Sequence, residues 1–189
     1  MYTGVILING PSATGKSSVA TELHQLCPTS VHISGDALRL FAPIEAKAIL
    51  GAGSTYRAAA TLANFYLQSG ASTVIFDYVF ESPVQVGHFS GSLNPAIACQ
   101  MFTLWAPLSM LEARDSTRSE AARQGERVSQ SLVAMQPHLS NLGRVIDTSD
   151  KSIPEVVQHI KNHLYGIQCL TRHSTGPARK AAQSGEFRR

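Results

Sequence analysis

A short stretch near the start of the chain combines glycines, a lysine and a serine at a spacing that suits phosphate chemistry. Residues 10–17 match the pattern G-x-x-x-x-G-K-[ST]. Gly10 and Gly15 permit backbone angles at which successive N–H groups curve around a phosphate. Lys16 supplies a positive charge to the β- and γ-phosphates, and the Ser17 hydroxyl is placed to hold Mg²⁺. We therefore expect a nucleotide-phosphate site made of Gly10, Pro11, Ser12, Ala13, Thr14, Gly15, Lys16, Ser17 and Ser18.

The flanks of this stretch have the order that such a loop needs. The apolar run at residues 5–8 predicts a buried strand, and residues 17–26 carry apolar positions at helical spacing. The positive N-terminal end of that helix would face the same anion. An ordinary glycine turn is the alternative, and the flanking strand and helix favour the phosphate site.

Three carboxylates stand at the ends of apolar runs, at Asp36, Asp77 and Asp147. In parallel sheets, ligands bind at the carboxyl ends of the strands. Asp36 suits a general base for a substrate hydroxyl that attacks the γ-phosphate, and it also suits a helix N-cap; the two roles are compatible. We expect Asp77 to bind Mg²⁺. It could instead contact the acceptor substrate or simply cap the end of the strand. Residues 147–149 have the form of a turn beside an adenine ring, although such turns are frequent.

Four arginines follow one another at spacings of four, five and four: Arg114, Arg118, Arg123 and Arg127. Acidic residues are interleaved with them, so a solvated helix with local ion pairs is one interpretation. The other is a lid over residues 112–130, whose arginines neutralise charge on the transferred phosphoryl group. We favour the lid, and the spacing does not decide which arginines face inward.

Short apolar runs alternate with helical patterns along the chain, which predicts a parallel sheet covered by helices on both faces. The predicted strands are 5–8, 30–34, 73–77, 98–105 and 144–147. The predicted helices are 17–26, 37–41, 55–68, 82–93, 107–118, 128–138 and one that starts at 154. Residues 1–165 are expected to form one domain.

Composition narrows the class of protein. The chain has 189 residues, 43% of them hydrophobic and 15% charged, with no apolar run of membrane-spanning length. Residues 166–189 hold five basic residues against one acidic, so this tail carries +4 and the remaining body −1 of the net +3. The body therefore gives no indication of a nucleic-acid partner. We expect the tail to be disordered or derived from an expression vector. Cys27, Cys99 and Cys169 lack metal-ligand spacing and are expected to be reduced in a cytoplasmic protein.

Five segments in order resemble the chloramphenicol phosphotransferase family of small P-loop kinases. They are residues 10–17, 34–38, 76–80, the arginine segment 114–128 and 147–149. The resemblance spans roughly residues 4 to 165. It implies a P-loop kinase-type three-layer α/β sandwich with a five-stranded parallel sheet. It also implies phosphorylation of a hydroxyl on a small molecule, with ATP and Mg²⁺ as cofactors.

The same resemblance assigns roles to residues of this chain. It implies that Asp36 is the catalytic base and that the lid arginines are Arg114, Arg118 and Arg127. We expect Asp36, Arg118 and Arg127, together with Lys16 of the phosphate loop, to be catalytic and Arg114 to contact the nucleotide. Ser17 and Asp77 are the expected metal ligands. Where the family carries a pair of aspartates this chain has Asp77 and Tyr78, in a region that should line the acceptor pocket. An apolar acceptor pocket could draw on Phe41, Tyr56, Phe65, Tyr78 and Phe80.

Two other functions stay open on the sequence alone. One is a metabolite kinase that acts on a nucleoside, a sugar or a sulfate nucleotide, and the other is a non-enzymatic ATP-binding switch. We expect no nucleic-acid or membrane partner, and self-association into a homo-oligomer stays open.

Overall fold

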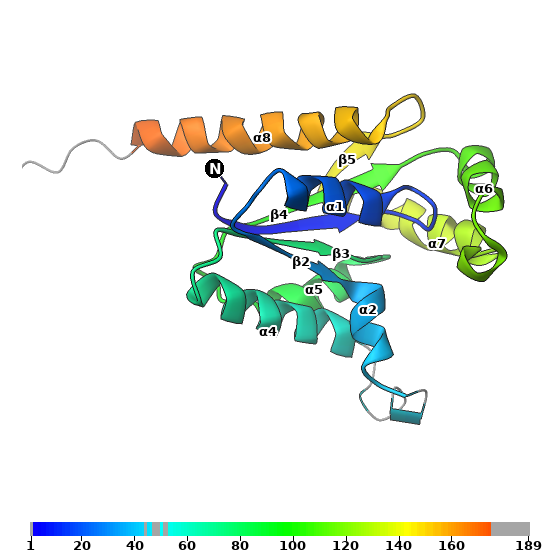
Figure 1. Cartoon of the computed structure of the whole chain (residues 1–189), viewed down its shortest axis with the longest axis horizontal. Helices are drawn as coiled ribbons and strands as arrows, with labels where there is room; N and C mark the ends of the chain where they lie inside the picture. The colour runs from blue at the N-terminus through cyan, green and yellow to red at the C-terminus, as the bar shows by residue number, and fades with distance from the viewer. Residues whose placement is uncertain (1, 44, 47–49, 51–52, 175–189) are drawn as a thin grey trace, which may run out of the picture.

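The sheet has five parallel strands in the order β2-β3-β1-β4-β5 (Figure 1). The computed structural model describes residues 2–43, 45–46, 50 and 53–174, with side chains as far as Leu164. The strands are β1 (Gly4–Asn9), β2 (Ser30–Ser34), β3 (Thr73–Asp77), β4 (Cys99–Trp105) and β5 (Arg144–Asp147). The predicted α/β fold with a five-stranded parallel sheet is confirmed.

Helices cover both faces of this sheet, because the central strand is apolar on both sides. Ile6 and Ile8 of β1 face α1 (Lys16–Gln25) and α8 (Ile153–Ser174) in one core cluster. Val5 and Leu7 face α4 (Ser54–Gln68) and α5 (Pro83–Ser90) in the other. This alternation along one strand follows from the two-residue period of β-structure. The result is the predicted three-layer sandwich, which Figure 1 shows from the edge of the sheet.

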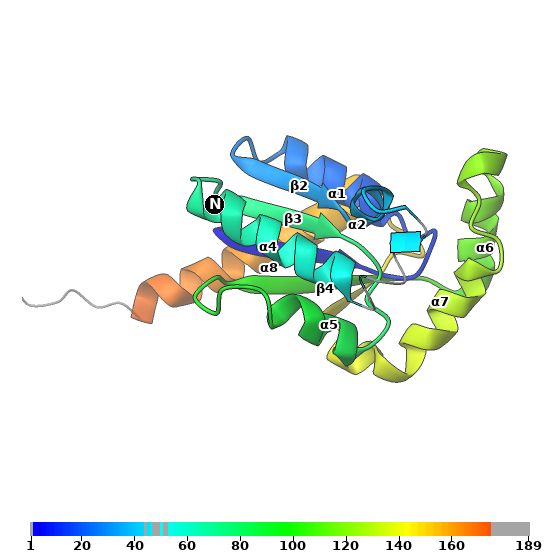
Figure 2. The same ribbon diagram turned by 90° about the horizontal axis from the view of Figure 1, so that it is seen from below.

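The remaining helices gather at the end of the sheet toward which the strands point. They are α2 (Gly35–Leu40), α6 (Leu108–Ser116) and α7 (Arg127–Met135), with short 3₁₀ turns at Glu120–Ala122 and Gln136–Asn141. Figure 2 shows α6 and α7 standing beyond the carboxyl ends of the strands. The expected lid over residues 112–130 therefore spans the end of α6, one 3₁₀ turn and the start of α7.

Most predicted boundaries agree with the structure to within one or two residues, and three helix ends differ by more. Helix α5 ends at Ser90 rather than at residue 93, and α7 ends at Met135 with a 3₁₀ turn after it, since Pro137 lacks the N–H that an α-helix needs. Helix α8 runs through Ser174, so residues 166–174, which were expected to begin a disordered or vector-derived tail, are helical. The rest of the expected tail lies outside the described residues.

Two sequence-based expectations concern the cysteines and the hydrophobicity of the helices. Cys27 and Cys99 are free thiols. The side chain of Cys169 lies outside the described part. Among the described helices, none combines the length and apolarity that crossing a membrane requires.

A buried polar network fixes the end of β1 where the ligand-binding edge begins. The side chain of Asn9 is fully buried, and its Nδ2 donates hydrogen bonds to the Phe80 carbonyl at 3.2 Å and to Thr103 Oγ1 at 3.0 Å. Its Oδ1 accepts a hydrogen bond from the Phe80 N–H at 2.8 Å. Asn9 thereby ties the segment that follows β3 to the central strand.

Candidate active site

The loop between β1 and α1 has the conformation expected for a phosphate-binding loop. Gly10 has φ 145°, and a Cβ there would lie 2.5 Å from the Leu104 carbonyl oxygen, so only glycine fits. Thr14 Oγ1 donates to the Pro11 carbonyl at 2.9 Å and closes the turn. Helix α1 begins directly after Gly15, which places its positive end at the loop.

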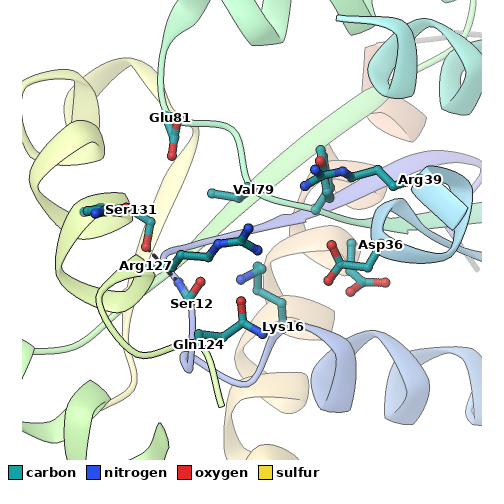
Figure 3. A pocket seen from close by; sticks show the side chains of 12 residues that line it. Ser12, Lys16, Asp36, Arg39, Val79, Glu81, Gln124, Arg127 and Ser131 are labelled. Carbon is teal, nitrogen blue, oxygen red and sulfur yellow. Dashed lines mark hydrogen bonds between the residues drawn. The ribbon is translucent and has the colours of Figure 1, made fainter. Parts of the chain in front are cut away.

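Lys16 lies at the centre of a polar cavity of about 280 Å³, which is also lined by Asp36, Asp77 and Arg127 (Figure 3). Its Nζ donates to the Pro11 carbonyl at 2.9 Å. Burial lowers the pKa of Lys16 to about 8, against the opposing attraction of Asp77 and Asp36. A bound phosphate would add a negative charge beside this ammonium.

The two expected metal ligands lie together. Ser17 Oγ donates to Asp77 Oδ2 at 2.7 Å, and Asp77 is only 4% exposed at the end of β3. The other carboxylate oxygen of Asp77 pairs with His32 Nε2 at 2.6 Å. A hydroxyl and a carboxylate are oxygen donors of the kind that Mg²⁺ prefers, and Mg²⁺ on a nucleotide takes few protein ligands. The residues present therefore fit the ion.

Asp36 faces the same cavity from the first turn of α2. The N-cap of this helix is Ser34, whose hydroxyl accepts from the Ala37 N–H at 3.5 Å, so the alternative of an N-cap role for Asp36 is wrong. The carboxylate is exposed and lies near Lys16 in Figure 3. Its position suits proton transfer from a substrate hydroxyl.

The arginines of the lid divide into two groups. Arg127 lines the Lys16 cavity, and Arg118 lines an adjoining cavity of about 120 Å³ beside Lys16 and Asp36. Arg123 instead donates to the carbonyls of Arg118 and Ser116, within the lid. Within the described residues, the lid contains one ion pair, Arg118 to Asp115 at 3.7 Å. The arrangement therefore favours the lid over a solvated helix with many ion pairs.

Arg114 and residues 147–149 meet at the other side of the phosphate loop. Arg114 donates to Thr148 Oγ1 at 3.2 Å and to the Thr148 carbonyl at 2.7 Å. Both residues line a cavity of about 200 Å³ against Thr14 and Gly15. Hydrogen bonds from Ser149 lower the pKa of Asp147, which lies outside this cavity lining. This cavity beside the phosphate loop suits the nucleoside part of a nucleotide. Because Arg114 is hydrogen-bonded to Thr148, we expect it to stabilise the cavity wall rather than to bind the phosphates.

Asp115 is a site residue that the sequence did not indicate. Its buried carboxylate accepts hydrogen bonds from the N–H groups of Gln124 and Gly125, each at 2.9 Å. Burial opposes ionisation, but those two N–H donors and Arg118 outweigh it and lower the pKa of Asp115. Asp115 thus holds the loop that presents Gln124 to the phosphate cavity.

A second contact that the sequence did not indicate joins the lid to the phosphate loop. The backbone N–H of Ser12 donates to Ser131 Oγ on α7 at 3.1 Å. Because these residues are 119 positions apart, no local pattern in the sequence could have paired them.

A larger cavity of about 460 Å³ adjoins the Lys16 cavity and shares Arg39 and Tyr78 with it. Of the five aromatic residues predicted for an acceptor pocket, Phe41, Tyr56 and Tyr78 line it. The prediction is wrong for the other two, because Phe80 is buried in the core and Phe65 is exposed on α4. Arg39 lines the same cavity and gives its wall a positive charge.

Comparisons with known proteins agree with this architecture. A family model described as an AAA domain matches residues 5–140. A gluconokinase from Sinorhizobium meliloti 1021 superposes with a TM-score of 0.69 at 19% identity, over 92% of this chain and 99% of that one. The tunicamycin resistance protein of Deinococcus radiodurans gives 0.65 at 19% identity, over 86% and 96%.

A thymidylate kinase from Candida albicans gives a TM-score of 0.60 at 15% identity, over 88% of this chain and 93% of that one. No curated protein matches the chain significantly. At these identities the neighbours show that the chain shares their fold.

Proposed function

The chain belongs to the AAA domain family, and from that premise we propose that it transfers the γ-phosphate of ATP to a hydroxyl group of a small molecule. One observation carries the proposal: Lys16, Asp36 and Arg127 line a single cavity at the carboxyl ends of the strands. A phosphate-binding cation, a candidate base and a second cation thus surround one space. That is the set of groups that phosphoryl transfer to a hydroxyl requires.

The roles follow from position. Asp36 accepts the proton of the acceptor hydroxyl while its oxygen bonds to the γ-phosphorus. The bond from that phosphorus to the β–γ bridging oxygen breaks, and ADP leaves with the bonding electrons. Lys16, Arg118 and Arg127 balance the charge on the phosphoryl oxygens. Ser17 and Asp77 would hold Mg²⁺, which neutralises phosphate charge when bound.

The finer part of the proposal is the acceptor, with chloramphenicol or another hydroxylated antibiotic as the first candidate. The resemblance over five ordered segments supports this class. Tyr78 follows Asp77 where the family has a second aspartate, so the acceptor pocket is the region in which this chain departs from it. A sugar, a nucleoside or a sulfate nucleotide is the second candidate, since the fold is shared with a gluconokinase and a thymidylate kinase.

ATP turnover with a panel of acceptors tests the proposal. The panel holds chloramphenicol, tunicamycin, gluconate and a nucleoside, and phosphorylated product is identified by mass spectrometry. We expect one compound to stimulate turnover strongly and to gain one phosphate, and Lys16→Ala to abolish this stimulation in a folded protein. Slow hydrolysis that no acceptor stimulates would instead favour the ATP-binding switch.

A further inference from the structure

Arg39 stands at the junction of the two large cavities. It lines both the Lys16 cavity and the larger cavity beside it. Figure 3 shows its side chain reaching from α2 toward Val79. Its positive charge acts on the phenol of Tyr78, which lines the same two cavities, and within the described residues the guanidinium forms no ion pair. A guanidinium so placed is suited to bind a carboxylate or phosphate of a ligand.

The position of Arg39 assigns this anion to the acceptor rather than to ATP. Lys16 of the phosphate loop, Arg118 and Arg127 already supply positive charge on the ATP side of the site. Arg39 instead follows Asp36 by three residues on α2, and residues three apart lie on one helical face. An acceptor that presents its hydroxyl to Asp36 therefore comes within reach of Arg39.

Tyr78 is held where it can orient Arg39. Its ring packs against Gly35, where a Cβ would lie 2.2 Å from Tyr78 Cδ2, so a larger residue would displace the ring. The ring also contacts Tyr56, with centroids 5.3 Å apart. This packing fixes the Tyr78 ring at the junction of the two cavities, where Arg39 also lies.

The larger cavity favours an acceptor that has an apolar part in addition to its anionic group. Its volume of about 460 Å³ exceeds that of the Lys16 cavity, and its walls include Leu38, Phe41 and Tyr56. Apolar walls of this kind gain free energy by burying an apolar body.

We propose that the acceptor is an amphiphilic hydroxy acid, and that Arg39 determines this specificity. Its hydroxyl faces Asp36, its anionic group binds Arg39, and its apolar body fills the larger cavity. The inference rests on the proposed function, because it takes Asp36 as the acceptor side of that site. Among the candidate acceptors, this ranks those that join an apolar body to an anionic group first, above chloramphenicol, which is a neutral aromatic alcohol, and above gluconate, which has no apolar body.

Three matched probes test the proposal by binding alone. They are 3-phenyllactate, which has both features, 3-phenylpropane-1,2-diol, which lacks the carboxylate, and glycerate, which lacks the phenyl ring. Affinities are measured by calorimetry on the full chain with Mg²⁺ and a non-hydrolysable ATP analogue. We expect phenyllactate to bind about 10- to 100-fold more tightly than the diol, as one charge-assisted hydrogen-bonded pair allows, and more tightly than glycerate.

Variants of the protein test whether Arg39 causes the preference for the carboxylate probe. Arg39→Gln should remove the difference between phenyllactate and the diol, whereas Arg144→Gln, a charge loss away from both cavities, should keep it. Ala58→Leu adds volume at the exposed wall of the larger cavity and should weaken both phenyl probes but not glycerate.

Equal binding of the carboxylate and diol probes, no binding of any probe, or a preference that survives Arg39→Gln would overturn the inference. Because the readout is binding, these outcomes are distinct from a failure of the proposed function, which is a failure of phosphoryl transfer.

Discussion

Asn9 offers a sharp test of how the fold supports the site. Its side chain makes three hydrogen bonds in the protein interior, two of them to the backbone of Phe80 and one to Thr103. Phe80 is itself fully buried, so water does not readily replace the lost partner. The segment that Phe80 belongs to also carries Tyr78 and Glu81, which line the Lys16 cavity.

The magnitude of the Asn9→Ala effect follows from the groups left behind. Alanine removes the donor to the Phe80 carbonyl and the acceptor of the Phe80 N–H. A buried backbone group left without a partner costs about 1–3 kcal/mol, so the two together should lower the free energy of unfolding by about 2–6 kcal/mol. The freed segment should also raise the KM for the acceptor more than that for ATP, because it lines the acceptor side.

Urea unfolding followed by circular dichroism measures this loss. Asn162→Ala is the matched control, since Asn162 is exposed on α8 and should change the free energy of unfolding by no more than about 0.5 kcal/mol. If Asn9→Ala unfolds at the same urea concentration as the parent, the reasoning from buried hydrogen bonds is refuted.

Three further predictions concern the charged groups of the site. Asp115→Asn should raise the KM for ATP and lower turnover while the protein stays folded, because the lid loop loses its carboxylate anchor; Glu112→Gln, an exposed change on the same helix, should do neither in steady-state assays. Burial lowers the pKa of Lys16 to about 8, and a bound phosphate should raise this pKa. ATP affinity, measured by calorimetry, should therefore be highest below pH 8 and fall above it by up to about tenfold per pH unit. An affinity that does not change with pH would contradict the role of Lys16 as a phosphate-binding cation. Arg127→Lys should lower turnover despite its kept charge, since an ammonium lacks the paired donors of a guanidinium, whereas Arg123→Lys should match the parent; equal rates for both variants would remove Arg127 from the site.

Much of the fold could be predicted because its signals are local. The five strands lie within one residue of their predicted bounds. β1 and β3 hold continuous apolar runs, and the shorter β2 and β5 each hold two apolar residues among polar ones. The phosphate loop is likewise encoded in eight consecutive residues. Helix ends were harder: Ile167 and Leu170 continue the apolar spacing of α8 past residue 165, but Gly166 and the polar, basic residues that follow hide this signal.

The rest of the site depends on contacts between distant parts of the chain. His32 pairs with Asp77 across 45 positions, and Asn9 meets Phe80 across 71. Neither pairing leaves a periodic signal. Asp115 was overlooked for another reason: its partners are backbone N–H groups, which every sequence has, so only the folded loop shows that they converge on one carboxylate.

The role of Asp36 as general base is the central claim, and the Asp36→Asn variant tests it most directly. Because Ser34 rather than Asp36 caps α2, the change should leave the melting temperature and the ATP affinity near those of the parent. The measurement is the rate of phosphoryl transfer to the acceptor at saturating ATP. We predict a loss of about 10²- to 10⁴-fold, as removal of a positioned base typically causes. Transfer at the parental rate in a folded, ATP-binding Asp36→Asn protein would contradict the account.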